Sequence, residues 1–155
     1  MLVKDVMAKP VTVAEDLPLR EVAAAMVRQH ASAVVVVGAQ GEPRGIVTER
    51  DFLESGELPY SERGGPTLLR IPLGAGAGTA VADARALPAR RIMRPLDAIV
   101  APGDVLEKAL DLMHHRGKRN VVVLHDGKVV GILGAQEFVR LAAKGPRAPP
   151  ALELV

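Results

Sequence analysis

One order of predicted secondary structure occurs twice in this chain of 155 residues. The first copy predicts a strand, a helix, two strands and a second helix at residues 11–13, 19–27, 34–37, 44–47 and 48–53. The second copy predicts the same elements at residues 99–100, 106–113, 121–124, 129–133 and 135–141. Each β-α-β-β-α copy has only about 50 residues, too few to bury a sizeable core by itself. The sequence therefore predicts an α/β protein of the α+β type, in which two copies pack with pseudo-twofold symmetry and a cleft between their sheets.

The two copies align with an almost constant offset. Met26 and Met113 are 87 positions apart (113 − 26), whereas Gly45 and Gly131 are 86 apart (131 − 45). The register therefore changes by one residue at the hairpin turn, as an internal repeat allows. A short apolar lead-in precedes each copy, Val6–Met7 in the first and Ile92–Met93 in the second.

Local signals support the same elements. In the first copy, Asp16 predicts a helix N-cap and Pro18 suits a first helical turn. The apolar face of that helix is predicted to comprise Leu19, Val22, Ala23, Met26 and Val27. In the second copy, Asp104 and Glu107 form a capping-box pattern, and Asp126–Gly127 predicts a tight hairpin turn.

These elements predict four segments: a first repeat at 1–56, a linker or insertion at 57–89, a second repeat at 90–143 and a flexible tail at 144–155. The linker contains a glycine-rich stretch, 74–79. It lacks the third glycine of a dinucleotide-binding fingerprint, because Thr79 stands there, and it lacks a phosphate-loop lysine. We therefore predict a flexible linker.

Composition excludes several functions. The absence of cysteine excludes disulfides and thiolate metal sites and is typical of a reducing cytosol. One Tyr, two Phe and no Trp leave almost nothing on which nucleic-acid bases could stack, and the net charge is only +2. The first residues lack a signal-peptide core, and no apolar run approaches the roughly 20 residues of a bilayer span. We expect a cytoplasmic protein without membrane contact, and nucleic-acid binding is unlikely on this composition.

No pattern of catalytic or metal-binding residues stands out. His114 and His115 are adjacent, so on a helix their side chains point about 100° apart and are poorly placed to share a metal. Neither a Ser/His/Asp set nor a distinctive carboxylate pair is evident. The sequence therefore predicts neither an enzyme nor a metal site, and no required cofactor.

The stretch Gly45–Asp51 is the strongest candidate for a binding site. Thr48 and Asp51 would place a hydroxyl and a carboxylate at a helix start, where a sugar hydroxyl or a phosphate can bind. The same spacing is also a capping box that needs no ligand. The second repeat has Gly134 and Glu137 at these positions, so the hydroxyl is lost. Capping alone does not require the copies to differ, whereas a ligand site in one copy does.

The repeated unit resembles a tandem pair of cystathionine-β-synthase (CBS) domains, a Bateman module. The resemblance rests on the lead-ins Val6–Met7 and Ile92–Met93, on Gly45–Asp51, and on the hairpin at 121–133. It covers about residues 1–56 and 90–143. Family members usually carry a proline where Val34 and Val121 stand, so the sequence departs from the pattern there.

The resemblance implies a regulatory module that binds an adenosine-containing ligand between the repeats, such as AMP, ADP, ATP or S-adenosylmethionine. Asp51 matches the aspartate that accepts the ribose hydroxyls, and Thr48 matches a hydroxyl contacting ribose or phosphate. Arg50 would pair with phosphate. The other residues that the resemblance places at the ligand are Ile46, Thr12, Val13, Ala33, Val34, Lys118 and Arg119.

The leading hypothesis is a non-enzymatic sensor that forms a homodimer, as family members do, and signals to a separate effector protein. A ligand-independent dimeric scaffold is the alternative, with Thr48 and Asp51 acting only as a cap. A third hypothesis is nucleic-acid binding through Lys118, Arg119, Arg85, Arg90, Arg91 and Arg94. The near-neutral net charge and the missing aromatics weigh against it.

Overall fold

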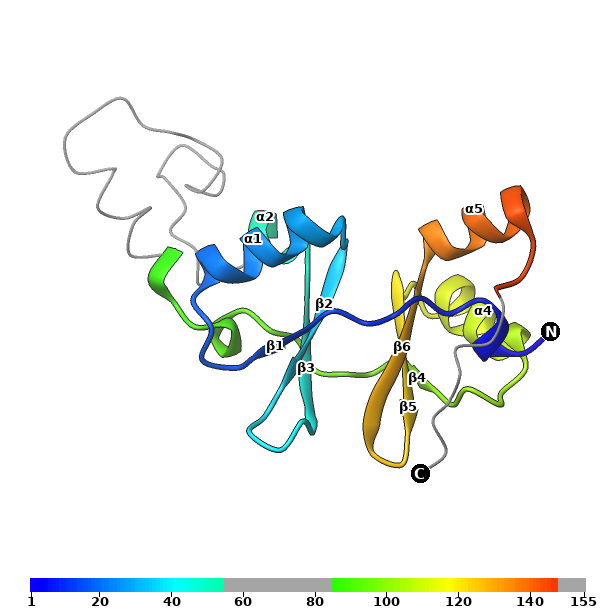
Figure 1. The fold of residues 1–155 in the computed structure, drawn as a ribbon, viewed down its shortest axis with the longest axis horizontal. Helices are drawn as coiled ribbons and strands as arrows, with labels where there is room; N and C mark the ends of the chain where they lie inside the picture. The colour runs from blue at the N-terminus through cyan, green and yellow to red at the C-terminus, as the bar shows by residue number, and fades with distance from the viewer. Residues whose placement is uncertain (55–84, 148–155) are drawn as a thin grey trace. The chain divides into compact units, whose positions relative to one another are not determined.

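The computed structural model describes residues 1–54 and 85–147, which form two compact units (Figure 1). One unit comprises Val11–Pro95 and contains the first sheet; we call it the first-sheet unit. The other combines Met1–Pro10 with the chain from Leu96 onward and is called the second-sheet unit. The predicted glycine-rich linker and the tail from residue 148 lie outside the described residues.

The first-sheet unit is a three-stranded sheet with its helices on one face. Its elements are β1 (Thr12–Ala14), α1 (Leu19–Gln29), β2 (Ala33–Val37), β3 (Pro43–Thr48), α2 (Asp51–Glu54) and the 3₁₀ turn η2 (Ala89–Arg91). The sheet order is β1-β2-β3, with β1 parallel and β3 antiparallel to β2. The core joins alternate strand residues to α1 and η2: Val13, Leu19, Val22, Met26, Val34, Val36, Val47, Ala89 and Ile92.

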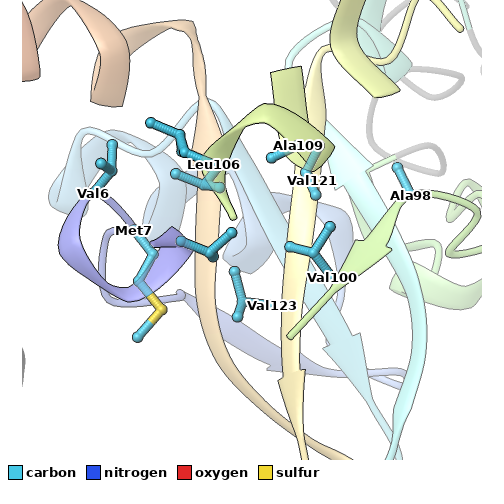
Figure 2. Packing of buried hydrophobic residues seen from close by; sticks show 10 residues of the cluster. Val6, Met7, Ala98, Val100, Leu106, Ala109, Val121 and Val123 are labelled. Carbon is cyan, nitrogen blue, oxygen red and sulfur yellow. The ribbon is translucent and has the colours of Figure 1, made fainter. Parts of the chain in front are cut away.

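The second-sheet unit repeats this order. Its elements are η1 (Val3–Asp5), β4 (Ile99–Val100), α4 (Leu106–His115), β5 (Asn120–His125), β6 (Lys128–Gly134) and α5 (Ala135–Lys144). The sheet order is β4-β5-β6, and both sheets carry a register shift at the same repeat position, after Val36 and after Val123. Figure 2 shows its core, where Val121 and Val123 of β5 meet Leu106 and Ala109 of α4. The predicted fold class, with two β-α-β-β-α repeats, is confirmed.

Each lead-in completes the unit of the other repeat. Val3, Val6 and Met7 are buried in the core of the second-sheet unit, where Figure 2 shows Val6 and Met7. Ala8 and Ile132 exchange backbone hydrogen bonds of 2.9 and 3.1 Å. In the first-sheet unit, Ala89 and Ile92 are likewise buried in the core. The compact units therefore do not coincide with the contiguous repeats in the sequence.

Three local predictions are wrong. The N-cap position of α1 is Pro18, and Asp16 instead pairs with Arg90 at 2.8 Å. Val27 does not belong to the buried face of α1, since it is 76% exposed. Asp104 does not cap α4, whose N-cap is Val105; its carboxylate accepts the backbone N–H of Ala101 at 2.8 Å. That hydrogen bond, with Lys108, lowers the pKa of Asp104.

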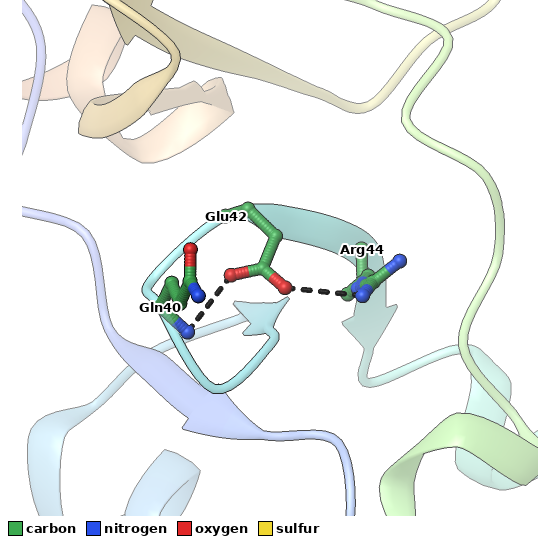
Figure 3. Close-up of polar contacts among 3 residues, drawn as sticks. All are labelled: Gln40, Glu42 and Arg44. Atoms are coloured by element: carbon green, nitrogen blue, oxygen red, sulfur yellow. Dashed lines mark hydrogen bonds and ion pairs between the residues drawn. The ribbon is translucent and has the colours of Figure 1, made fainter.

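The hairpin turns follow the sequence closely. Asp126 and Gly127 have φ values of 50° and 76°, the two positive values that a tight type I′ turn requires. In the other hairpin, the Glu42 carboxylate accepts the backbone N–H of Gln40 at 2.9 Å and the Arg44 guanidinium at 3.0 Å (Figure 3). Backbone N–H groups, its own first and then that of Gln40, lower the pKa of Glu42, and Arg44 adds to this.

Residues 145–147 follow α5 and are the last described residues of the chain. Lys144 is the last residue of α5, and the backbone N–H of Arg147 donates to the carbonyl oxygen of Asp5 at 2.7 Å. Lys144 therefore belongs to α5, and Arg147 contacts the N-terminal segment at Asp5.

Gly45 lets the lead-in after η2 approach β3. A Cβ at this position would lie 2.8 Å from the carbonyl oxygen of Arg94 and 3.0 Å from the Cγ and Sδ atoms of Met93. Gly45→Ala is therefore expected to lower the free energy of unfolding by about 1–3 kcal/mol through overpacking. Gly103→Ala is the matched control, because no atom lies within 4 Å of its added Cβ. Urea unfolding of both variants measures the difference, and equal stabilities would contradict the close approach.

Candidate ligand-binding site at the end of β3

One face of the first sheet carries the polar residues of the site. Thr12 pairs with Val35, Val35 with Ile46, and Ile46 with Arg94, so these four residues lie side by side across the strands. Because side chains alternate between faces, Thr48 shares this face with Ile46. The neighbouring residues Val13, Val34 and Val47 point to the opposite face, into the core.

Asp51 is the centre of the site. It is 1% exposed and is the only charged residue among the fully buried ones of residues 1–52 and 85–147. Its Oδ2 atom accepts the backbone N–H of Thr48 at 2.8 Å and the Thr48 hydroxyl at 3.1 Å. These two bonds hold the carboxylate at the start of α2 and offset part of the free-energy cost of burying its charge.

The helix start therefore differs in detail from a reciprocal capping box. Thr48 is the last residue of β3, and α2 begins at Asp51. The Asp51 carboxylate caps the backbone N–H of Thr48, but the hydroxyl of Thr48 donates to the same carboxylate. The predicted side chains of Thr48 and Asp51 are therefore in direct contact, through a hydrogen bond from the hydroxyl to one carboxylate oxygen.

Arg94 is the residue that the sequence interpretation did not place at this site. Its Nε pairs with Oδ1 of Asp51, the oxygen that Thr48 leaves unused. The backbone of Arg94 is fixed to β3 by two hydrogen bonds with Ile46, each of 2.9 Å. The offset of 86 (94 − 8) maps Arg94 onto Ala8, which bridges Ile132 as Arg94 bridges Ile46. No local sequence pattern links Arg94 to Asp51, so the structure was needed to place it.

The second-sheet unit has a different set of side chains at the equivalent place. Glu137 accepts the backbone N–H of Gly134 at 2.9 Å, so the cap persists without a hydroxyl. Asn120 pairs with Gly134 where Ala33 pairs with Thr48. A Cβ on Gly134 would lie 3.0 Å from Oδ1 of Asn120, so the amide uses space that a threonine would need. The chemistry of the two units is therefore distinct at this position.

The other predicted ligand contacts are spread more widely. Thr12 and Arg50 are exposed, and Ile46 is partly exposed. Ala33, Val13 and Val34 are buried, and the last two lie in the core, so their side chains are already packed. Lys118 and Arg119 belong to the second-sheet unit, where Lys118 pairs with Asp97 and Arg119 is exposed.

Two of the histidines lie close to an aspartate near them in the sequence. His115 pairs with Asp111 at 2.7 Å, one helical turn away, and His125 lies 3.3 Å from Asp126. Across the described ranges, no group of three or more His, Cys, Asp or Glu side chains is arranged to hold a metal ion. In the same part of the chain, no helix has both the length and the apolar character needed to span a bilayer.

The fold and the site together define a duplicated β-α-β-β-α module in which a threonine hydroxyl contacts a buried carboxylate. The family profile described as "CBS domain" matches the sequence twice, at residues 3–57 and 89–144. The chain therefore belongs to the CBS-domain family and is a tandem CBS pair, a regulatory module. A comparison with curated protein sequences returned no match.

Solved structures of CBS proteins have the same fold. The CBS domain of a CBS domain-containing membrane protein from Sphaerobacter thermophilus is 28% identical, with a TM-score of 0.73 over 91% of this chain and 87% of that one. A putative acetoin utilization protein from Vibrio cholerae is 23% identical, with a TM-score of 0.69 over 92% and 90%. The CBS domain pair of protein MJ0100, solved with 5′-methylthioadenosine and S-adenosylmethionine, is 20% identical, with a TM-score of 0.66 over 92% and 96%.

Proposed function

We propose that this CBS pair binds an adenosine-containing ligand at Thr48 and Asp51 and regulates a separate effector protein. The observation that carries the proposal is the buried carboxylate of Asp51, which a threonine hydroxyl and an arginine surround in only one of the two repeats. A carboxylate has enough lone pairs to accept both hydroxyls of a ribose. The adenosine compounds bound by the MJ0100 pair support this class of ligand.

The other parts of the site would contribute to the same ligand. Side chains would come from Ile46 of β3, from Arg50 just after it, and from Thr12 of the same sheet. Backbone groups would come from Ala33, Val13 and Val34. We also propose Lys118 and Arg119 as sources of positive charge, on the resemblance alone. No metal and no cofactor are required, and we propose a cytoplasmic homodimer that does not bind nucleic acid.

Regulation would follow from a difference in affinity. A ligand shifts a protein between two states only as far as it binds one state more tightly. Asp51 joins β3, α2 and the segment after η2, because Thr48 and Arg94 both contact its carboxylate. A ligand that replaces one of these contacts alters how that segment is held, and an effector protein would respond to that change.

Thermal unfolding with a panel of ligands tests the proposal. AMP, ADP, ATP, S-adenosylmethionine and NAD are added in turn, with GTP and inorganic phosphate as controls. A ligand at about 100 times its dissociation constant stabilises by about 2.7 kcal/mol, which corresponds to roughly 5–10 °C in a chain of this size. A shift with at least one adenosine compound and none with the controls is expected.

The alternative function is a ligand-independent scaffold, in which Asp51 serves only as a cap. The hydrogen bond from the Thr48 backbone to Asp51 favours it, since that bond needs no ligand. If no member of the panel moves the melting temperature, the sensor proposal is wrong for those ligands and the scaffold is preferred.

A further inference from the structure

We propose that Arg94 makes the site selective for adenosine ligands that carry a phosphate over adenosine itself. This inference rests on the proposed function and specifies that the ligand carries a negative charge. It starts from the ion pair between Arg94 and Asp51, which uses the carboxylate oxygen that Thr48 does not.

The two partners differ in how firmly they are held. Asp51 is fixed, because its side chain is only 2% exposed and accepts two hydrogen bonds from Thr48. The Arg94 backbone is fixed on β3 by its paired hydrogen bonds with Ile46. The Arg94 side chain, in contrast, is 56% exposed. Its guanidinium can therefore swing into solvent by side-chain rotation while the backbone stays in place.

A ribose and Arg94 compete for the same oxygen. Oδ2 of Asp51 already accepts two hydrogen bonds, so a vicinal diol that binds the carboxylate must use Oδ1. The guanidinium occupies that position in the structure. Binding of the diol therefore displaces Arg94 or forces it to share the oxygen.

The charge of the ligand decides the outcome of this competition. When an uncharged nucleoside binds, its hydroxyls take the carboxylate oxygen that Arg94 contacted. The nucleoside offers Arg94 no anion in return. A nucleotide brings a phosphate, and guanidinium pairs with phosphate through two parallel hydrogen bonds. The displaced arginine then exchanges one anionic partner for another, so the phosphate offsets the ion pair that the ribose removes.

The second repeat lacks the same combination. Ala8 stands at the position of Arg94, and Gly134 stands at the position of Thr48. The lead-in bridge and the carboxylate cap are retained in both units, at Ile46–Arg94 and Ile132–Ala8. The backbone bridge therefore forms without the guanidinium. The arginine is found in the same unit as the threonine hydroxyl and the aspartate.

Binding of AMP and of adenosine to three proteins tests the proposal. The proteins are wild type, Arg94→Ala and Arg90→Ala, the last being a control because Arg90 lies in the same segment and pairs with Asp16 on the surface. Isothermal titration calorimetry gives the ratio of the two dissociation constants. In wild type, AMP is expected to bind at least about tenfold more tightly than adenosine.

In Arg94→Ala, that ratio is expected to fall about tenfold, with AMP weaker and adenosine unchanged or tighter. Arg90→Ala should keep the wild-type ratio. Arg94→Gln, which keeps a polar side chain without the positive charge, serves as a second variant if Arg94→Ala is poorly folded. Adenosine and AMP binding with an unchanged ratio in both Arg94 variants overturns this inference alone. Absence of binding by every ligand in every protein overturns the proposed function and, with it, this inference.

Discussion

Asp51→Ala is expected to weaken binding of the adenosine ligand by a hundredfold or more. Two ribose hydroxyls donate to a charged acceptor, and each such hydrogen bond contributes about 1.5–3 kcal/mol. Loss of both therefore amounts to at least about 3 kcal/mol, which is more than two powers of ten in the dissociation constant. The ligand identified by thermal unfolding is titrated into both proteins by calorimetry.

The control for Asp51→Ala is Glu137→Ala, which removes the equivalent carboxylate of the second repeat. Both variants lose the cap of a backbone N–H, which contributes about 1 kcal/mol of stability. Asp51→Ala should lose more stability than Glu137→Ala, because it also removes the contacts with the Thr48 hydroxyl and Arg94. Only Asp51→Ala should lose the ligand. Unchanged binding in Asp51→Ala would place the ligand elsewhere, and a larger loss in Glu137→Ala would place it in the second-sheet unit.

Leu19→Ala is expected to cost about 3 kcal/mol of unfolding free energy, within a range of about 2–5 kcal/mol. Leu19 is 1% exposed and lies in the core of the first-sheet unit. Its removal loses apolar burial and leaves a cavity, since the surrounding valines cannot collapse fully. Urea unfolding monitored by circular dichroism measures the change.

Val27→Ala is the matched control, because Val27 lies on the same helix and is 76% exposed. Its effect should stay within about 0.5 kcal/mol. Similar costs for the two substitutions would mean that the apolar face of α1 is not the one in the structure.

Periodicity predicted the elements well but not the width of their buried faces. The β-branched runs at 34–37 and 121–123 fall inside β2 and β5, and the turn residues Asp126 and Gly127 have the expected conformation. Val27, however, lies about 80° around the helix from Leu19. It therefore stands at the margin of the apolar stripe, where the neighbouring elements rather than the spacing decide burial.

The candidate site was predictable only as far as it is local. Thr48 and Asp51 are three residues apart, and a cap at this spacing follows from helix geometry. Arg94 lies 43 residues beyond Asp51 (94 − 51), and no short pattern connects the two. Only the sheet register brings them together, through the bridge between Ile46 and Arg94. The packing of Val13 and Val34 into the core likewise depends on which face of the sheet the helices cover.

The exchanged lead-ins bear on how such a chain can arise. A single β-α-β-β-α repeat that begins with its own lead-in cannot complete its own core, because Val3, Val6 and Met7 are buried against β4–β6 rather than against β1–β3. Two identical single-repeat chains would each complete the other by swapping this segment, which is an accessible route to a dimer. Gene duplication and fusion of such chains joins them end to end and leaves both cores unchanged. The two copies are then free to diverge in side chains such as Arg94 and Ala8 while each still closes the other's unit.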